Sequence, residues 1–335
     1  MSELATIGKR RRDGAREAAR GAAIAGLGVA LPEAAVGNAP IAERLGVSER
    51  WIVSRTGVRE RRIAPDGERL YEYAARAATA ALQNAGVDPG ALDLVLVATM
   101  SHEQLTPSAA ALVAAEIGAA RAGAVDIGAA CTGFVSGIGL ACGQIESGRA
   151  SSVLVAGADL LSRLTDRDDR STAALFGDGA GAVVVGAIGG RSRIGPVVLG
   201  ADGASSHLVE ADRADGLIHM KGPDLFRQAV DRFCEVVEQA AAAAGLPLAE
   251  IDLFAFHQAN ARITQAVGER LELPSERVVE CIDRYGNTSA ATIPLALAEA
   301  QREGRLRPGA KVLLAAFGGG LTWGGTVVEW GGGDA

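Results

Sequence analysis

The segment Ala85-Gly-Val-Asp-Pro-Gly-Ala-Leu-Asp-Leu-Val-Leu-Val-Ala98 has a counterpart later in the chain, Ala244-Gly-Leu-Pro-Leu-Ala-Glu-Ile-Asp-Leu-Phe-Ala-Phe-His257. In each copy an alanine-rich helical stretch ends at a glycine turn, and an apolar run of buried-strand length follows. Helices that alternate with such strands predict an α/β architecture with buried sheets.

A second pair of matching segments places two reactive side chains. Gly148 and Gly304 each lie in a short turn before an apolar, strand-like run. Cys131 lies seventeen residues before Gly148, and Asn287 lies seventeen residues before Gly304. Both residues therefore stand at the start of a helix-compatible segment in corresponding places, which predicts two βαβ-type halves packed around a shared cleft.

The repeat also sets the expected domain limits within the 335 residues. We expect one half at residues 21–187, carrying the cysteine, and the other at 191–331, carrying His257 and Asn287. Residues 1–20 are rich in arginine and precede the first strand-like run, so they are predicted to form a mobile basic tail.

Composition excludes several classes of function. Hydrophobic content of 48% is typical of a globular protein, and a net charge of −7 argues against nucleic-acid binding, which needs a basic surface. The four cysteines lack metal-binding spacing, so we expect no metal. No apolar run reaches the ~18 residues of a membrane span, and no secretory signal is recognised, which favours the cytoplasm.

Cys131 is the candidate nucleophile. It lies between an apolar strand-like run and a helical segment at 134–147. A sulfur at a helix N-terminus has its thiolate favoured by the aligned peptide dipoles, so we expect a lowered pKa. The alternative is a buried structural cysteine, which fits Cys142 and Cys234 better.

Two further residues are candidates for the chemistry. His257 ends an apolar strand, where α/β proteins place ligand-contacting groups, although His102 occupies a similar position in the first copy and competes for the role. Asn287, followed by Thr-Ser, equally fits a helix N-cap. Its correspondence with Cys131 favours a functional role.

Several segments together resemble the β-ketoacyl-acyl-carrier-protein synthase III (KAS III) family of thiolase-like condensing enzymes. They occur in the family's order and extend over nearly all of residues 21–331: Trp51-Ile-Val-Ser-Arg-Thr-Gly-Val-Arg-Glu-Arg-Arg62, Ala129-Ala-Cys-Thr-Gly-Phe134, Phe176-Gly-Asp-Gly-Ala-Gly181, His257-Gln-Ala-Asn260, Gly286-Asn-Thr-Ser-Ala290 and Phe317-Gly-Gly-Gly-Leu-Thr-Trp-Gly324.

The resemblance implies a five-layer αβαβα fold, a homodimer and ping-pong chemistry with acyl-CoA and malonyl-acyl-carrier protein as substrates. Cys131 would carry the acyl group, and the backbone N–H groups of Cys131 and Gly319 would form the oxyanion hole. His257 and Asn287 would donate hydrogen bonds to the malonyl thioester oxygen during decarboxylation. No cofactor is implied, because CoA enters as part of the substrate.

The resemblance also assigns a CoA site. Trp51 and Arg170 would bracket the adenine, and Arg55 would lie near the phosphates. The pantetheine channel would be lined by Gly222, Phe226 and Asn260, and Arg262 would dock the acidic carrier protein.

Thr106 departs from a well-studied subgroup of the family, which has phenylalanine at this position. That side chain closes the acyl pocket of the partner subunit, so a threonine would leave room for longer or branched acyl groups. Acyl length and the pathway served stay open. Two alternatives also stay open: an acyltransferase that moves an acyl group to an alcohol, amine or carrier thiol without forming a carbon–carbon bond, and a non-catalytic partner of a condensing enzyme.

Overall fold

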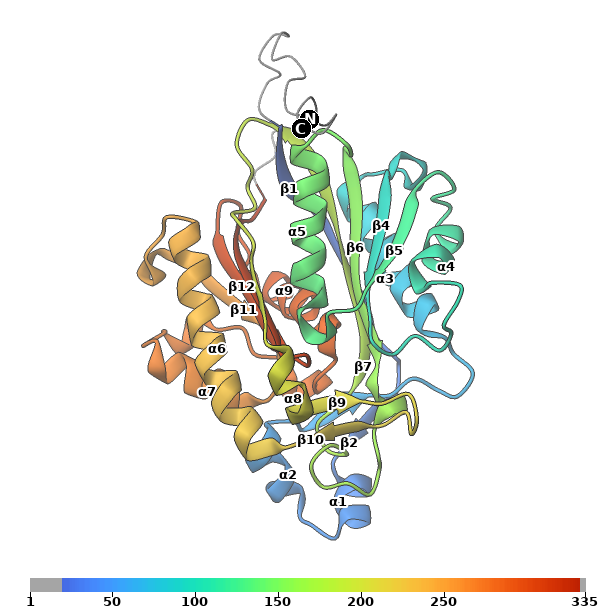
Figure 1. Cartoon of the computed structure of the whole chain (residues 1–335), viewed down its shortest axis with the longest axis vertical. Helices are drawn as coiled ribbons and strands as arrows, with labels where there is room; N and C mark the ends of the chain where they lie inside the picture. The colour runs from blue at the N-terminus through green and yellow to red at the C-terminus, as the bar shows by residue number, and fades with distance from the viewer. Residues whose placement is uncertain (1–19, 332–335) are drawn as a thin grey trace, which may run out of the picture.

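The computed structural model describes residues 20–331, which form two β-sheets with helices on both sides of each and between them (Figure 1). Residues 1–19, which contain nearly all of the predicted basic tail, lie outside the described part of the chain. None of the helices within 20–331 combines the length and apolar character needed to cross a membrane.

The first sheet is built from residues before Gly190 and has the strand order β1-β7-β6-β4-β5. Its strands are β1 (Arg20–Ala30), β4 (Leu94–Ala98), β5 (Gly123–Ile127), β6 (Ser152–Leu160) and β7 (Asp178–Gly189). β4 pairs in parallel with β5 and β6, whereas β7 is antiparallel to both β1 and β6. The first strand-like run, which was predicted to follow residues 1–20, and the apolar run that ends at Ala98 are therefore confirmed as β1 and β4.

The second sheet is built from residues after Gly190 and has the order β11-β12-β13-β8. Its strands are β8 (Val198–Ala201), β11 (Leu253–Phe256), β12 (Lys311–Gly318) and β13 (Thr322–Glu329). β11 and β12 are parallel, and the remaining pairs are antiparallel. Two small antiparallel two-stranded sheets complete the strands: β2 (Ala35–Gly37) with β3 (Glu60–Arg62), and β9 (Val209–Ala211) with β10 (Ile218–Met220).

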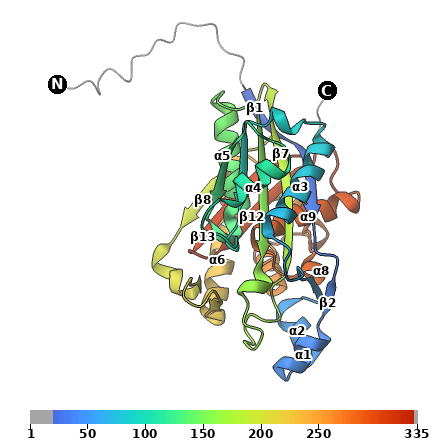
Figure 2. The same ribbon diagram turned by 90° about the vertical axis from the view of Figure 1, so that its right-hand side faces the viewer.

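Helices cover both faces of each sheet. The helices are α1 (Ala39–Leu45), α2 (Glu49–Thr56), α3 (Leu70–Ala85), α4 (Ala109–Glu116), α5 (Gly133–Glu146), α6 (Gly222–Ala243), α7 (Ala261–Arg270), α8 (Ile282–Tyr285) and α9 (Thr292–Arg302). α5 and α9 lie between the sheets, α3 and α4 cover the outer face of the first sheet, and α6 and α7 cover the outer face of the second (Figures 1 and 2).

Alternating side chains explain this layering. Along β12, Val312 and Leu314 point into the central core with α5 and α9, whereas Leu313 and Ala315 point outward to the core under α6. Successive side chains of a strand face opposite sides, so a strand that is apolar at every position must be covered on both faces. The predicted five-layer αβαβα fold is confirmed by this arrangement.

Candidate active site

Cys131 lies on a short turn at the start of α5. The 3-10 turn Ala130–Thr132 follows β5 and leads directly into α5, as the sequence predicted for the nucleophile. Gly318, at the end of β12, approaches the turn so closely that a Cβ added there would lie 2.8 Å from the Cβ of Cys131. The second half of the chain therefore forms one wall of the cysteine site.

The pKa of Cys131 departs from the expectation. Burial raises the pKa of this thiol to about 11, and the nearby carboxylate of Asp159 contributes to the rise. Hydrogen bonding from the Ser289 side chain and the Gly319 backbone opposes the rise without cancelling it. The lowered pKa expected from the helix N-terminus was wrong, because desolvation of the thiolate outweighs the dipole. The free cysteine is a thiol at neutral pH.

His257 follows β11 and is almost fully buried, with 1% of its surface exposed. Its backbone N–H bonds to the carbonyl of Ala315 at 2.8 Å, and its Nδ1 lies 2.6 Å from Oγ1 of Thr292. Burial lowers the pKa of His257 to about 3, although a hydrogen bond with the Ser289 backbone partly opposes this shift. The imidazole is therefore neutral at physiological pH and carries a single N–H.

Asn287 lies between α8 and the 3-10 turn Ser289–Ala291, and its carboxamide is held in one orientation. Its Oδ1 accepts the backbone N–H of Ser289 at 2.9 Å, and its Nδ2 faces the carbonyl of Ala259 at 3.4 Å. The backbone of Asn287 is fixed by bonds to Leu175 and Gly177 of the other half. Because the oxygen is already occupied, the amide nitrogen is the group that Asn287 presents as a donor.

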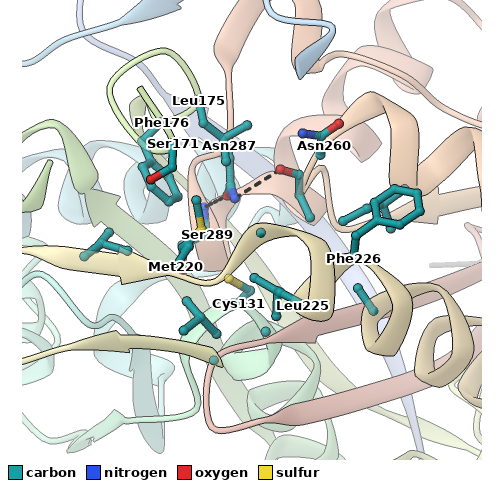
Figure 3. A pocket seen from close by; sticks show the side chains of 18 of the residues that line it. Cys131, Ser171, Leu175, Phe176, Met220, Leu225, Phe226, Asn260, Asn287 and Ser289 are labelled. Atoms are coloured by element: carbon teal, nitrogen blue, oxygen red, sulfur yellow. Dashed lines mark hydrogen bonds between the residues drawn. The ribbon is translucent and has the colours of Figure 1, made fainter. Parts of the chain in front are cut away.

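A single cavity of about 940 Å³ brings these residues together. Figure 3 shows the sulfur of Cys131 in the same pocket as Asn287, with Phe226 and Asn260 farther along. Of the residues predicted from the sequence, the cavity is lined by Cys131, His257, Asn287, Gly319, Trp51, Arg55, Arg170, Gly222, Phe226, Asn260 and Arg262.

The predicted CoA residues form a connected outer section of this cavity. The guanidinium of Arg55 stacks over the ring of Trp51 at 4.9 Å, and that of Arg262 lies 5.5 Å from the ring of Phe226. Asn260 forms hydrogen bonds with the backbones of both arginines. Its Nδ2 donates to the carbonyl of Arg55 at 3.0 Å, and its Oδ1 accepts the N–H of Arg262 at 2.9 Å. Asn260 is therefore also the N-cap of α7.

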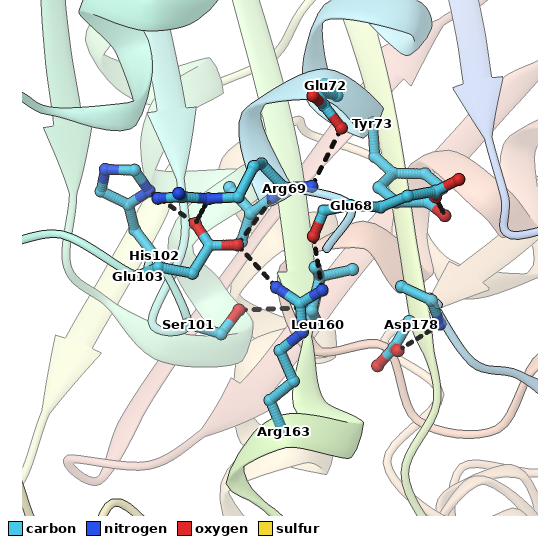
Figure 4. Close-up of polar contacts among 12 residues, drawn as sticks. Glu68, Arg69, Glu72, Tyr73, Ser101, His102, Glu103, Leu160, Arg163 and Asp178 are labelled. Carbon is cyan, nitrogen blue, oxygen red and sulfur yellow. Dashed lines mark hydrogen bonds and ion pairs between the residues drawn. The ribbon is translucent and has the colours of Figure 1, made fainter. Parts of the chain in front are cut away.

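Thr106 and His102 lie elsewhere. Thr106 is exposed on the loop between β4 and α4 and does not line the cavity of its own chain. His102 does not line the cavity either, and its ring nitrogens face Glu103 and the carbonyl of Pro107. Glu103 pairs with Arg163 at 2.6 Å in a polar cluster on the side of the first sheet that carries α3 (Figure 4). His102 is thus separate from the cysteine site.

Sequence reasoning missed part of this site. It did not single out the apolar lining near the cysteine, which includes Met100, Leu161, Leu175, Ile218 and Met220. It also missed Thr292, which is 35 residues from the histidine it contacts and resembles any first-turn helix residue. A hydroxyl one turn after the Asn-Thr-Ser segment was the only available signal.

The chain has two β-sheets with helices packed between them, and its buried cysteine shares a cavity with a neutral imidazole and an oriented carboxamide. This combination defines a thiolase-like condensing enzyme. Residues 125–203 match the family profile described as 3-oxoacyl-[acyl-carrier-protein (ACP)] synthase III, and residues 241–330 match the profile of its C-terminal part.

Individual relatives agree with the profiles. The β-ketoacyl-[acyl-carrier-protein] synthase III of Listeria innocua is 42% identical over 92% of this chain and 99% of its own length. The crystal structure of the Aquifex aeolicus 3-oxoacyl-[acyl-carrier-protein] synthase III superposes with a TM-score of 0.89 at 43% identity, covering 92% of this chain and all of that one. A priming β-ketosynthase from the R1128 polyketide pathway superposes equally well, with a TM-score of 0.89 at 36% identity, covering 95% of this chain and 99% of its own.

The chain therefore belongs to the 3-oxoacyl-[acyl-carrier-protein] synthase III family, as the sequence motifs indicated. It is an acyltransferase-type condensing enzyme with a role in starting fatty-acid or polyketide synthesis.

Proposed function

We propose that this enzyme takes an acyl group from acyl-CoA onto Cys131 and condenses it with malonyl-acyl-carrier protein. The observation that carries the proposal is the shared cavity, in which a nucleophile from one half of the chain meets two hydrogen-bond donors, His257 and Asn287, from the other. The alternative is an acyltransferase that forms no carbon–carbon bond. It has less support, because an Asn287 that presents its amide nitrogen as a donor has no role in simple acyl exchange.

The first half-reaction is transthioesterification. The sulfur of Cys131 attacks the thioester carbonyl, its proton goes to the departing CoA thiolate, and the tetrahedral oxyanion is stabilised by the N–H groups of Cys131 and Gly319. The closeness of Gly318 to Cys131 supports this assignment, since it brings the end of β12 beside the sulfur.

The second half-reaction begins when malonyl-acyl-carrier protein enters and loses CO₂. The electron pair of the broken bond moves to the thioester oxygen as an enolate, which accepts hydrogen bonds from Nε2–H of His257 and Nδ2–H of Asn287. The enolate carbon then attacks the acyl carbonyl, and the C–S bond breaks to release the ketoacyl product and the Cys131 thiolate, which takes a proton from water and returns to the thiol. No carbon needs an external oxidant or reductant, so the proposal requires no redox cofactor.

The outer section of the cavity fits a CoA thioester. Trp51 and Arg170 would hold the adenine and Arg55 the phosphates, since planar and cationic groups suit stacking and phosphate contact. Gly222, Phe226 and Asn260 would line the pantetheine channel, and Arg262 would contact the acidic carrier protein. Within the cell the proposal places this chemistry in the cytoplasm, where thiols stay reduced.

A homodimer is part of the proposal. β5 is an edge strand of the first sheet, and Val125 on it is 50% exposed. Leu140 of α5 and Leu199 of β8 are also exposed, at 51% and 53%. Exposed apolar side chains on an unpaired edge favour association. Thr106 would then face the partner's acyl pocket and leave room for longer or branched chains. Sedimentation should show a dimer that Val125→Lys dissociates, whereas Thr79→Lys on the exposed face of α3 should not.

The decisive experiment separates the half-reactions. Wild-type protein mixed with acyl-CoA should gain the mass of one acyl group, which Cys131→Ala should lose. With malonyl-acyl-carrier protein added, ketoacyl product and CO₂ should appear. His257→Ala should impair product formation far more than acyl loading. Acyl turnover onto another acceptor without CO₂ would favour the non-condensing alternative, and an unmodified wild-type chain would favour a non-catalytic partner.

A further inference from the structure

The 3-10 turn Ser289–Ala291, in the second half of the chain, packs directly on strand β6 of the first half. Two residues of β6 face this turn, Gly157 and Asp159. They lie on the same face of the strand as Val155, which belongs to the central core. A Cβ added at Gly157 would lie 2.3 Å from the carbonyl oxygen of Ala290 and 2.6 Å from its carbonyl carbon. The backbone of the turn is therefore in contact with the backbone of the strand.

Asp159 is fully buried at the end of this contact. Its Oδ1 accepts the backbone N–H of Met100 at 2.9 Å and the hydroxyl protons of Thr99 at 3.1 Å and Ser101 at 2.7 Å. Its Oδ2 faces the backbone N–H of Ala290 at 3.4 Å. Each hydroxyl also accepts a backbone N–H, so its single proton is available for the carboxylate. Asp159 thus joins the loop after β4 to the turn of the other half.

Stability alone does not account for a carboxylate at this place. Within residues 20–331, Asp159 forms no ion pair with an arginine, lysine or histidine. Burial of such a charge costs free energy, and desolvation accordingly raises the pKa of Asp159. The donors that face both of its oxygens, including an N–H at the start of the helical segment that continues into α9, fit the ionised form. A costly charge beside the active site indicates a role in the chemistry.

The turn requires support from its surroundings because its backbone is strained. Ser289 has a φ of 51°, in the left-handed region that side chains other than glycine rarely adopt. Ala130, beside Cys131 in the other turn, has a φ of 45°. Such conformations cost free energy and persist only where the neighbouring structure holds them. The contacts of β6 with the turn are therefore expected to determine its position.

Two groups of the active site take their orientation from this turn. Oδ1 of Asn287 accepts the backbone N–H of Ser289 at 2.9 Å. Oγ1 of Thr292, the residue directly after the turn, lies 2.6 Å from Nδ1 of His257. A shift of the turn therefore changes the geometry of both side chains assigned to the malonyl thioester. Cys131 is less dependent on the turn, because its own turn is continuous with α5.

We propose that Gly157 and Asp159 are positioning residues that hold the turn Ser289–Ala291 in the place required for condensation. They act through Asn287 and His257, whose orientation depends on the turn. Neither Gly157 nor Asp159 lines the cavity, so neither is assigned a contact with substrate. The inference rests on the proposed function, in which Asn287 and His257 act on the malonyl thioester.

The first test is Gly157→Ala. Relieving the contact of its Cβ requires the turn to move by roughly 1 Å, and a misplacement of about 1 Å costs on the order of 100-fold in rate. We expect kcat for condensation to fall by about 100-fold and the rate of acyl loading on Cys131 by less than about 10-fold. Gly26→Ala is the matched control, because a Cβ there would lie 2.3 Å from the carbonyl oxygen of Ala81, in α3 on the outer face of the sheet. It should leave the ratio of condensation to loading unchanged.

The second test is Asp159→Asn, which keeps the shape and the acceptor Oδ1 but places an amide N–H group against the N–H of Ala290. We expect kcat for condensation to fall by about 10- to 100-fold, with loading and the KM for malonyl-acyl-carrier protein within about 3-fold of the wild type. Asp178→Asn is the control. Asp178 is also fully buried and accepts from Ala64 and Ser162, but it faces the outer core and does not line the cavity.

The outcomes separate this inference from the proposed function. Wild-type protein that loads acyl groups but never condenses would refute the function. Crystal structures of the variants would then still decide the inference: a displaced turn with a reoriented Asn287 supports it, and an unmoved turn overturns it. Equal losses of loading and condensation in Gly157→Ala, or a loss of condensation no larger than in Gly26→Ala, would also overturn it. If Gly157→Ala does not fold, the comparison of Asp159→Asn with Asp178→Asn decides.

Discussion

Alanine at Gly318 should slow acyl loading strongly, whereas alanine at the neighbouring Gly319 should not. A Cβ on Gly318 would lie 2.8 Å from Cβ, 2.9 Å from the backbone N and 3.2 Å from Sγ of Cys131. A Cβ on Gly319 would meet nothing closer than 3.7 Å. Neither glycine has a positive φ, so the comparison isolates the steric effect.

The expected size of the effect follows from these distances. Relieving the contact requires the end of β12 or the Cys131 turn to move by roughly 0.5 Å, and a misplacement of about 1 Å costs on the order of 100-fold in rate. Overpacking a close-packed site costs about 1–3 kcal/mol, which corresponds to a fall in Tm of roughly 1–4 °C for a chain of this size. Gly319→Ala keeps its backbone N–H, so the oxyanion contact survives.

The assay is the rate at which the intact protein gains an acyl mass after mixing with acyl-CoA. We expect loading in Gly318→Ala to be about 10- to 100-fold slower than in the wild type, with Gly319→Ala near the wild-type rate. Thermal unfolding of both variants checks that they fold. Equal loading rates in the two variants, or the reverse order, would refute the reasoning that β12 determines the position of the sulfur.

Three further predictions concern other parts of the molecule. Trp51→Ala should raise KM for acyl-CoA but leave loading from a short acyl-pantetheine thioester unchanged, because that substrate has no adenine to stack; an equal effect on both would contradict the assignment. Arg61→Ala should cost about 3 kcal/mol in urea unfolding, because buried Arg61 donates to Asn38 and to the carbonyls of Val36 and Ala174. Arg62→Ala, whose partners are more exposed, should cost under about 1 kcal/mol. His257 has a pKa of about 3 when folded and takes up a proton on unfolding between pH 6.5 and 3, so stability falls as the pH drops through this window. At pH 5 this loss is about 2 kcal/mol, and urea unfolding at pH 7 and 5 should show it in the wild type but not in His257→Gln.

The sequence predicted those parts of the structure that depend on local pattern. Apolar runs located β4 and β12, since a strand buried on both faces must be apolar at every position. The spacing of Cys131 and Asn287 from matching glycine turns predicted that the two would share a cleft, and both line the same cavity.

Properties set by contacts between distant segments escaped prediction. The pKa of Cys131 is raised by burial and by the carboxylate of Asp159, and it is lowered in part by hydrogen bonds from Ser289 and Gly319, which lie more than 150 residues away in the chain. A strand-turn-helix pattern reveals the dipole at Cys131 but not this desolvation. The effect of Thr106 requires a second copy of the chain.

The contact between two turns explains why the chemistry can be divided between the halves. The 3-10 turn that carries Cys131 packs against the 3-10 turn Ser289–Ala291 that follows Asn287, and α5 and α9 extend from these turns into the same central core. This packing couples the position of Cys131 to that of the turn after Asn287. Because the carboxamide of Asn287 accepts the backbone N–H of Ser289, and the backbone of Asn287 is bonded to Leu175 and Gly177, this donor needs little reorganisation when charge moves onto the enolate oxygen. A neutral imidazole suits this task, since it donates to the enolate without adding a buried positive charge whose desolvation would cost several kcal/mol.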